Sequence, residues 1–235
     1  MKSLFTANNA WVNGRELRRN TAIVVENGCI EDVISRETLP TDLSAFSVHK
    51  ADFLFPGFIN SHCHLEYSFM EGRLPRGDSD FDTWLNAIYM LKRDLGDAEY
   101  AQSTRDGINR SLAGGTTTVI DTVHRAAAAP VLADSPIRYV LFWEVIAVKD
   151  EWAAGEMGRL EERFAMPRGA RCVNVGVSPH APYTVGPELR RLLREFFGKH
   201  PDVPAAWHLS ETAAEFRLFA EGLGPIVDFY AKREL

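Results

Sequence analysis

The sequence predicts an α/β fold with parallel strands, preceded by a small layer of β-structure. From residue 55 onward, candidate strands alternate with amphipathic helix candidates, whereas residues 1–54 contain only short β-prone runs. Asn13-Gly14 and Asn27-Gly28 separate these runs, and such pairs favour tight hairpin turns because both positions adopt positive φ. We therefore expect residues 1–54 to form the N-terminal part of a small β-sandwich, and residues 55–235 to form the larger domain.

The N-terminal segment has three strand candidates: Ala10–Val12, Thr21–Glu26 and Cys29–Ile34. Three or four short strands in about 50 residues bury too little apolar surface for a core of their own. We therefore expect this layer to pack beside the larger domain.

The larger domain shows the alternation typical of parallel strands joined by right-handed crossovers, in a doubly wound sheet or a barrel. Its strand candidates are Phe53–Ile59, Thr116–Asp121, Arg138–Val145, Arg171–Val177 and Pro204–His208. Its helix candidates are Asp82–Leu95, Ala98–Ala113, Glu151–Phe164 and Pro187–Lys199. A (β/α)₈ barrel usually needs ~250 residues. The sequence therefore predicts either an open sheet or an incomplete barrel of about five βα units.

Composition narrows the classes of function and partner. The chain has 235 residues, 46% hydrophobic and 25% charged, with a net charge of −6 and no basic stripe. Nucleic acids and membrane surfaces are therefore poor candidate partners. Cys29, Cys63 and Cys172 lie far apart, which argues against a disulfide framework. The N-terminus has no signal-peptide pattern and no apolar run could span a membrane, so a cytoplasmic location is expected.

The most informative motif is His62-Cys63-His64, which directly follows an apolar strand candidate. Side chains at i and i+2 of a strand point the same way, so both imidazoles can reach one metal ion while Cys63 points away. Barrels keep their sites at the C-terminal ends of strands, which is where this motif lies. His62 and His64 are therefore candidate metal ligands.

A second motif, His208-Leu209-Ser210-Glu211, follows another apolar run. His208 would complete a face of three imidazoles, and Glu211 would lie near a bound water without being a ligand. Metal-assisted hydrolysis needs such a Lewis acid and a carboxylate that moves a proton. The alternative is a buried structural histidine followed by a solvated glutamate.

Two further residues are candidates for substrate contact. Pro179 and Pro182 hold His180 in a restricted loop after a strand, where the imidazole can contact substrate or stabilise an oxyanion. Glu66, two residues after His64, either reaches the substrate or anchors the first βα loop.

These motifs, together with Pro56-Gly57 and Gly115-Thr116-Thr117-Thr118, resemble the amidohydrolase superfamily. The match is to its cytosine-deaminase-like and chlorohydrolase-like branch. The run from His62 to Ser68 is similar to members that deaminate aminofutalosine. The resemblance implies a (β/α)₈ barrel with a small β-sandwich and one divalent metal, zinc or alternatively iron.

The resemblance also assigns roles to the candidate residues. His62, His64 and His208 would be the metal ligands, Glu211 the proton shuttle, and His180 a catalytic and substrate-binding residue. The expected activity is hydrolysis of a non-peptide carbon–nitrogen bond, by deamination of an aminated heterocycle or nucleoside-like small molecule. A dehalogenating relative of the chlorohydrolase type is the alternative enzyme.

The family pattern also has a histidine after strand 6 and an aspartate after strand 8, both of which would lie beyond Leu235. A catalytically inactive fragment is therefore the alternative from another class. Open barrel edges would then pair with a second copy of the chain or with a missing C-terminal part.

Overall fold

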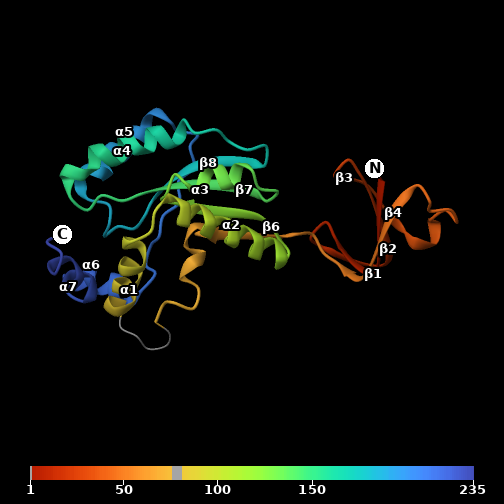
Figure 1. Ribbon diagram of the computed structural model, residues 1–235, viewed down its shortest axis with the longest axis horizontal. Coiled ribbons are helices and arrows are strands. Elements are labelled where there is room, and N and C mark those ends of the chain that lie inside the picture. The colour runs from red at the N-terminus through yellow and green to blue at the C-terminus, as the bar shows by residue number, and fades with distance from the viewer. Residues whose placement is uncertain (1, 76–80) are drawn as a thin grey trace. The chain divides into compact units, whose positions relative to one another are not determined.

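The computed structural model describes residues 2–75 and 81–235, and the chain divides into two compact units, Met1–Gly57 and Phe58–Leu235 (Figure 1). Each unit is built around its own four-stranded sheet. Among the described residues, no helix is long and apolar enough to cross a membrane.

The N-terminal unit is one mixed sheet with strand order β3-β2-β1-β4. Its first two hairpins are antiparallel, whereas β1 and β4 run parallel. The strands are β1 (Lys2–Val12), β2 (Glu16–Glu26), β3 (Cys29–Ser35) and β4 (Phe46–Leu54), with a 3₁₀ turn η1 (Arg36–Thr38) between the last two.

Both asparagine-glycine turns are confirmed. Asn13 and Gly14 have φ of 53° and 68°, and Asn27 and Gly28 have φ of 52° and 81°, which is the left-handed conformation that a tight hairpin needs. The apolar core beneath the sheet is small and contains Ala7, Ala10, Val12, Val33 and Leu54. The packing of this layer beside the larger domain stays a prediction.

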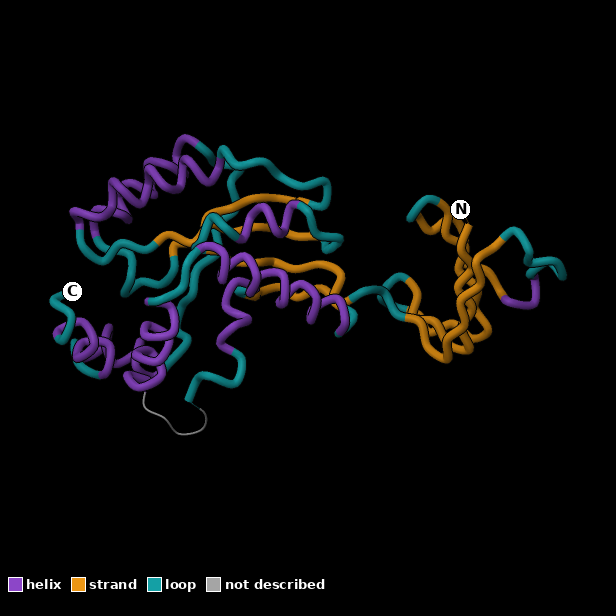
Figure 2. Tube along the Cα trace, viewed as in Figure 1, coloured by secondary structure: helices purple, strands orange, loops and turns teal. Residues whose placement is uncertain are grey.

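The second unit contains a parallel sheet with strand order β5-β6-β7-β8, flanked by helices (Figure 2). The strands are β5 (Phe58–Cys63), β6 (Thr116–Val123), β7 (Arg138–Val145) and β8 (Cys172–Pro179). The helices are η2 (Leu65–Met70), α1 (Phe81–Arg93), α2 (Asp97–Ala113), α3 (Ala128–Ala133), α4 (Asp150–Phe164), α5 (Pro187–Lys199), α6 (Ala213–Glu221) and α7 (Pro225–Ala231).

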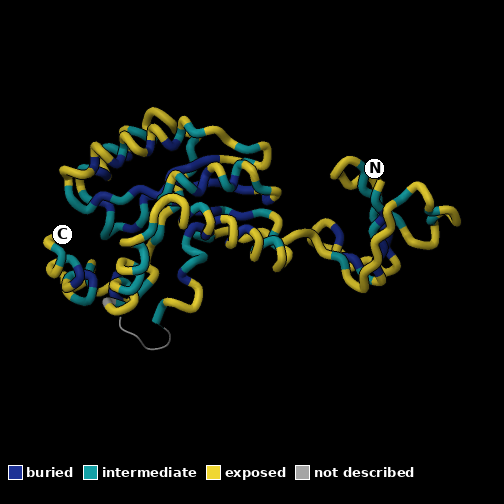
Figure 3. The backbone as a smooth tube through the Cα atoms, viewed as in Figure 1, coloured by how far each residue is buried: buried dark blue, intermediate teal, exposed yellow. Residues whose placement is uncertain are grey.

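The core of this unit lies between the sheet and its helices, where the buried parts of the chain gather (Figure 3). Trp143 of β7 is among its largest buried side chains and belongs to one cluster with Leu132, Leu160 and Leu189 of α3, α4 and α5. Alternation along β7 then directs Glu144 to the opposite face of the sheet. Because Trp143 packs into this core, Glu144 lies on the other face of the sheet.

Two predicted strands differ in the structure. The run Phe53–Ile59 is divided, because β4 ends at Leu54 and β5 begins at Phe58 in the other sheet. Pro56 lies in the gap and has no N–H to donate to a ladder. The segment Pro204–His208 is extended but is not a regular strand. It runs parallel to β8 through one bridge, Val177 to Ala205, and through hydrogen bonds from Val177 N to the Pro204 carbonyl and from Ala206 N to the Val177 carbonyl.

Candidate metal and catalytic site

The three histidines singled out by the sequence come together at the ends of their elements. Nε2 of His208 lies 3.2 Å from Nε2 of His64 and 3.2 Å from Nε2 of His62. One nitrogen of each ring lies within 4.8 Å of the other two. Residues that are 144 and 146 positions apart in the chain therefore present their ring nitrogens to one point.

The geometry of β5 explains why His62 and His64 share a side. Cys63 between them turns the other way, where it packs against the core and its thiol donates to the Ile120 carbonyl at 3.5 Å. Just after the motif, the amide of Leu65 donates to Oδ1 of Asp121 at 2.8 Å. Asp121 is fully buried, so this bond fixes where the chain leaves the strand. Neither Cys63 nor Asp121 is among the residues that meet at the histidine site.

His208 is oriented by the main chain of His180. The carbonyl of His180 accepts a hydrogen bond from the amide of His208 at 3.0 Å and another from its Nδ1 at 2.8 Å. Because a carbonyl can only accept, Nδ1 carries the hydrogen and Nε2 keeps its lone pair. Histidine ligands of metal ions in proteins are typically held by a contact of this kind.

Burial keeps the imidazoles of His62 and His64 neutral. It lowers the pKa of His64 to about 3, with smaller effects from His208 and His62. Burial and His208 also lower the pKa of His62, and the negative charge of Glu211 opposes that shift. Neutral imidazoles have the free lone pair that a metal ligand requires.

The spacing of the Nε2 atoms fits one ion. Two nitrogens bound at ~2.0–2.1 Å in tetrahedral geometry lie roughly 3.3 Å apart. Two of the separations in the site, from Nε2 of His208 to Nε2 of His64 and to Nε2 of His62, are both 3.2 Å. The donor set therefore fits a divalent cation such as zinc or iron.

His180 lies beside this cluster in the loop that follows β8. Its Nδ1 is 2.8 Å from the hydroxyl of Thr184, which leaves Nε2 for another partner. Burial lowers the pKa of His180 to about 3, with further contributions from His208 and His64. The ring is therefore neutral at physiological pH.

Glu211 is exposed and follows Ser210, whose φ of 57° marks a sharp change of chain direction. Its amide donates to Oε2 of Glu215 at 2.9 Å, at the start of α6. Among the described residues, the Glu211 carboxylate makes no hydrogen bond, but its charge raises the pKa of His62. A free carboxylate thus lies near the histidines.

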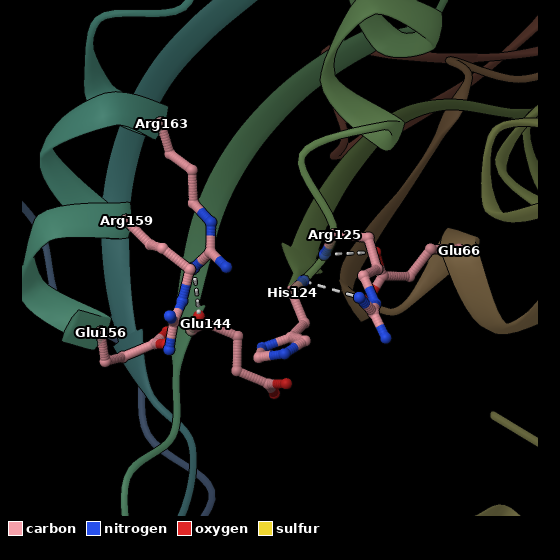
Figure 4. Close-up of polar contacts among 7 residues, drawn as sticks. All are labelled: Glu66, His124, Arg125, Glu144, Glu156, Arg159 and Arg163. Carbon is pink, nitrogen blue, oxygen red and sulfur yellow. Dashed lines mark hydrogen bonds and ion pairs between the residues drawn. The ribbon is translucent and has the colours of Figure 1, made fainter. Parts of the chain in front are cut away.

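Glu66 is fully buried and accepts hydrogen bonds from the amides of His124 and Arg125 at 3.0 and 2.9 Å (Figure 4). These contacts attach the first βα loop to the end of β6. This is the alternative role expected for Glu66, in which it anchors that loop. Burial raises the pKa of Glu66. A substrate contact by Glu66 stays a prediction.

Two charged residues near the site, one buried and one half-buried, were missed by the sequence analysis. Glu144 is 2% exposed, and one of its oxygens lies within 4.8 Å of ring nitrogens of His180 and His208. Burial raises the pKa of Glu144 to about 8. Lys92 of α1 donates to the hydroxyl of Tyr67 at 2.7 Å, and burial lowers its pKa. The sequence feature that could have identified Glu144 is the presence of a glutamate inside the apolar run Arg138–Val145.

The comparisons with known proteins decide the family. A model of the amidohydrolase family matches residues 53–226. The chain belongs to the amidohydrolase family. Its similarity to a 5-methylthioadenosine/S-adenosylhomocysteine deaminase of Desulfovibrio desulfuricans is 28% identity over 223 residues, or 90% of this chain and 50% of that protein. An aminodeoxyfutalosine deaminase of Deinococcus radiodurans is 29% identical over 178 residues, or 74% of this chain and 40% of that protein.

Solved deaminase structures share the fold. Helicobacter pylori aminofutalosine deaminase in complex with methylthio-coformycin superposes with a TM-score of 0.76 at 18% identity, covering 98% of this chain and 56% of that one. A zinc-bound adenosine deaminase from Xanthomonas campestris gives 0.70 at 22% identity, covering 97% and 54%. The predicted α/β class, with part of a (β/α)₈ barrel, is therefore confirmed. The chain spans about half the length of the curated relatives that it matches.

Proposed function

We propose that this chain carries the metal-binding part of a hydrolase that acts on non-peptide carbon–nitrogen bonds and deaminates an aminated heterocycle or nucleoside. The observation that carries the proposal is the convergence of three Nε2 atoms, with two separations of 3.2 Å, beside a free carboxylate. The deaminase names of the relatives from Desulfovibrio and Deinococcus support the reaction class.

In this proposal His62, His64 and His208 hold one divalent cation. The cation would supply Lewis-acid polarisation, which lowers the pKa of water. Zinc is the first candidate because the Xanthomonas adenosine deaminase binds it, and three imidazoles also suit iron. The His180 carbonyl keeps the lone pair of His208 directed into the site.

The side chains around the cation have separate tasks. The Glu211 carboxylate takes up a proton from water and returns it to a ring nitrogen of the substrate, since it is exposed and free of hydrogen bonds among the described side chains. His180 contacts the substrate through its free Nε2 while Thr184 holds the other ring nitrogen. We infer that the substrate is a small molecule. We also infer that the enzyme is cytoplasmic.

A combined metal and ammonia measurement tests this proposal. The full polypeptide that contains this chain is loaded with zinc or iron, analysed for metal, and screened for ammonia release from amino-purines, amino-pyrimidines and their nucleosides. We expect about one ion for each chain and metal-dependent release from at least one substrate. Ammonia release that does not respond to chelation, or chloride release from halogenated rings alone, would contradict the proposal.

A further inference from the structure

The carboxyl group of Glu144 is a buried acid that the proposed reaction does not use. Its Oε1 is buried without a hydrogen-bond partner among the described residues. Arg163 of α4 donates instead to the main-chain carbonyl of Glu144 at 3.1 Å and to Glu156 at 3.3 Å. In Figure 4 the Glu144 carboxyl group points away from Arg163, toward the side of His124. Leaving a buried carboxyl group unpaired costs stability, so its retention calls for a ligand.

Glu144 and His180 are close enough for one intervening atom to contact both. An oxygen of Glu144 and a ring nitrogen of His180 lie within 4.8 Å of each other, yet no hydrogen bond joins them among the described residues. An atom that forms two hydrogen bonds of about 2.8 Å at a tetrahedral angle holds its partners roughly 4.6 Å apart. Thr184 occupies Nδ1 of His180, so Nε2 is free for such an atom.

A hydroxyl group fits this position. It can donate to a carboxyl oxygen and at the same time pair with an imidazole nitrogen, whereas a ring N–H has only one hydrogen and no acceptor. His208, the third member of the group, already uses Nδ1 on the His180 carbonyl and directs Nε2 to His62 and His64.

The charges on the two sides of the histidine cluster differ. Glu211 acts on the pKa of His62, whereas the charged groups that act on Glu144 are Lys92, Glu66, Arg163 and Glu156. The proposed proton shuttle therefore acts on His62, whereas the unpaired carboxyl group lies beside His180 and His208. A substrate whose reacting carbon lies near Glu211 would extend another part toward Glu144 and His180.

We propose that Glu144 is a substrate-contacting residue, whose carboxyl group and the His180 imidazole together bind one hydroxyl group of the substrate. This inference rests on the proposed function and narrows it. The substrate is a hydroxyl-bearing nucleoside and not a free heterocyclic base. Glu144 determines the preference for a nucleoside over a free base, and it contacts a part of the substrate other than the reacting carbon.

Deoxy analogues test the contact. The zinc-loaded full polypeptide is assayed with adenosine and its 2′-, 3′- and 5′-deoxy derivatives, as wild type and as Glu144→Leu. We expect Glu144→Leu to lower kcat/KM about 10- to 100-fold for substrates that carry the contacted hydroxyl group, as expected when a buried hydrogen-bonding group is left without its partner. For the one derivative that lacks it, we expect no further loss. Glu144→Gln, which keeps the size and an acceptor oxygen, should show the same selectivity with a smaller loss.

Glu156→Gln is the matched control, because Glu156 is also a buried carboxylate but is paired with Arg159 and Arg163. Its effect should be the same factor on every substrate. An equal loss on all four substrates in Glu144→Leu, or no loss, would overturn the contact. If the wild type releases no ammonia, the proposed function fails, and equilibrium dialysis then decides the contact. Equal adenosine binding by wild type and Glu144→Leu, or binding by neither, would overturn it.

Discussion

Replacing His208 should weaken metal binding more than any other single histidine change. Its Nε2 is 3.2 Å from both other ring nitrogens, so it is the common neighbour in the cluster. Structural zinc sites with four ligands bind with about 10–16 kcal/mol, or roughly 3–4 kcal/mol for each ligand. His208→Ala should therefore lower zinc affinity by about 100- to 1,000-fold.

The assay is a zinc titration in competition with a chromophoric chelator. His49→Ala is the control, because it removes an imidazole from β4 in the other unit, where His49 contacts Ser47 and stacks on Phe5. That variant should bind zinc as the wild type does. Equal zinc affinity in His208→Ala and wild type would refute the assignment of the three imidazoles as ligands.

Three further predictions concern the site and its support. Glu211→Gln should abolish most ammonia release by the full polypeptide while its zinc content stays unchanged. The control is Glu221→Gln, which changes an exposed carboxylate paired with Arg217 and should alter neither ammonia release nor zinc content. Thr184→Val removes the hydroxyl group that holds His180 and should lower kcat/KM about 10-fold without loss of zinc; an unchanged kcat/KM would contradict the positioning of His180. Burial raises the pKa of Asp121 well above its usual range, so the stability that it contributes is complete at low pH and is lost as pH rises through that pKa. The unfolding free energy from urea titrations should therefore fall with rising pH less steeply in Asp121→Asn than in wild type, and equal slopes would contradict this.

The conformational preferences of short sequence segments were sufficient to predict much of the fold. The asparagine-glycine turns need only the φ preference of two residues, and both form as predicted. The strand Arg138–Val145 and the helix Pro187–Lys199 have their predicted bounds, because a continuous apolar run and an N-terminal proline mark them. The helix α3 (Ala128–Ala133) was missed, since six residues rich in alanine give no amphipathic period.

The site depended on contacts that a sequence cannot show. The motifs identified His62, His64 and His208, but the hydrogen bond from His208 to the His180 carbonyl joins residues 28 positions apart. Glu144 was missed because a single glutamate in an apolar strand shows neither the face it occupies nor its neighbours. Those neighbours, His180 and His208, come from other elements.

Anomalous scattering at the zinc edge, from crystals of the zinc-loaded protein, tests the central claim most directly. The account predicts one strong peak at ~2.0–2.1 Å from Nε2 of each of His62, His64 and His208. A peak held by Glu144, His180 and His208, or zinc bound away from all three predicted ligands, would contradict it.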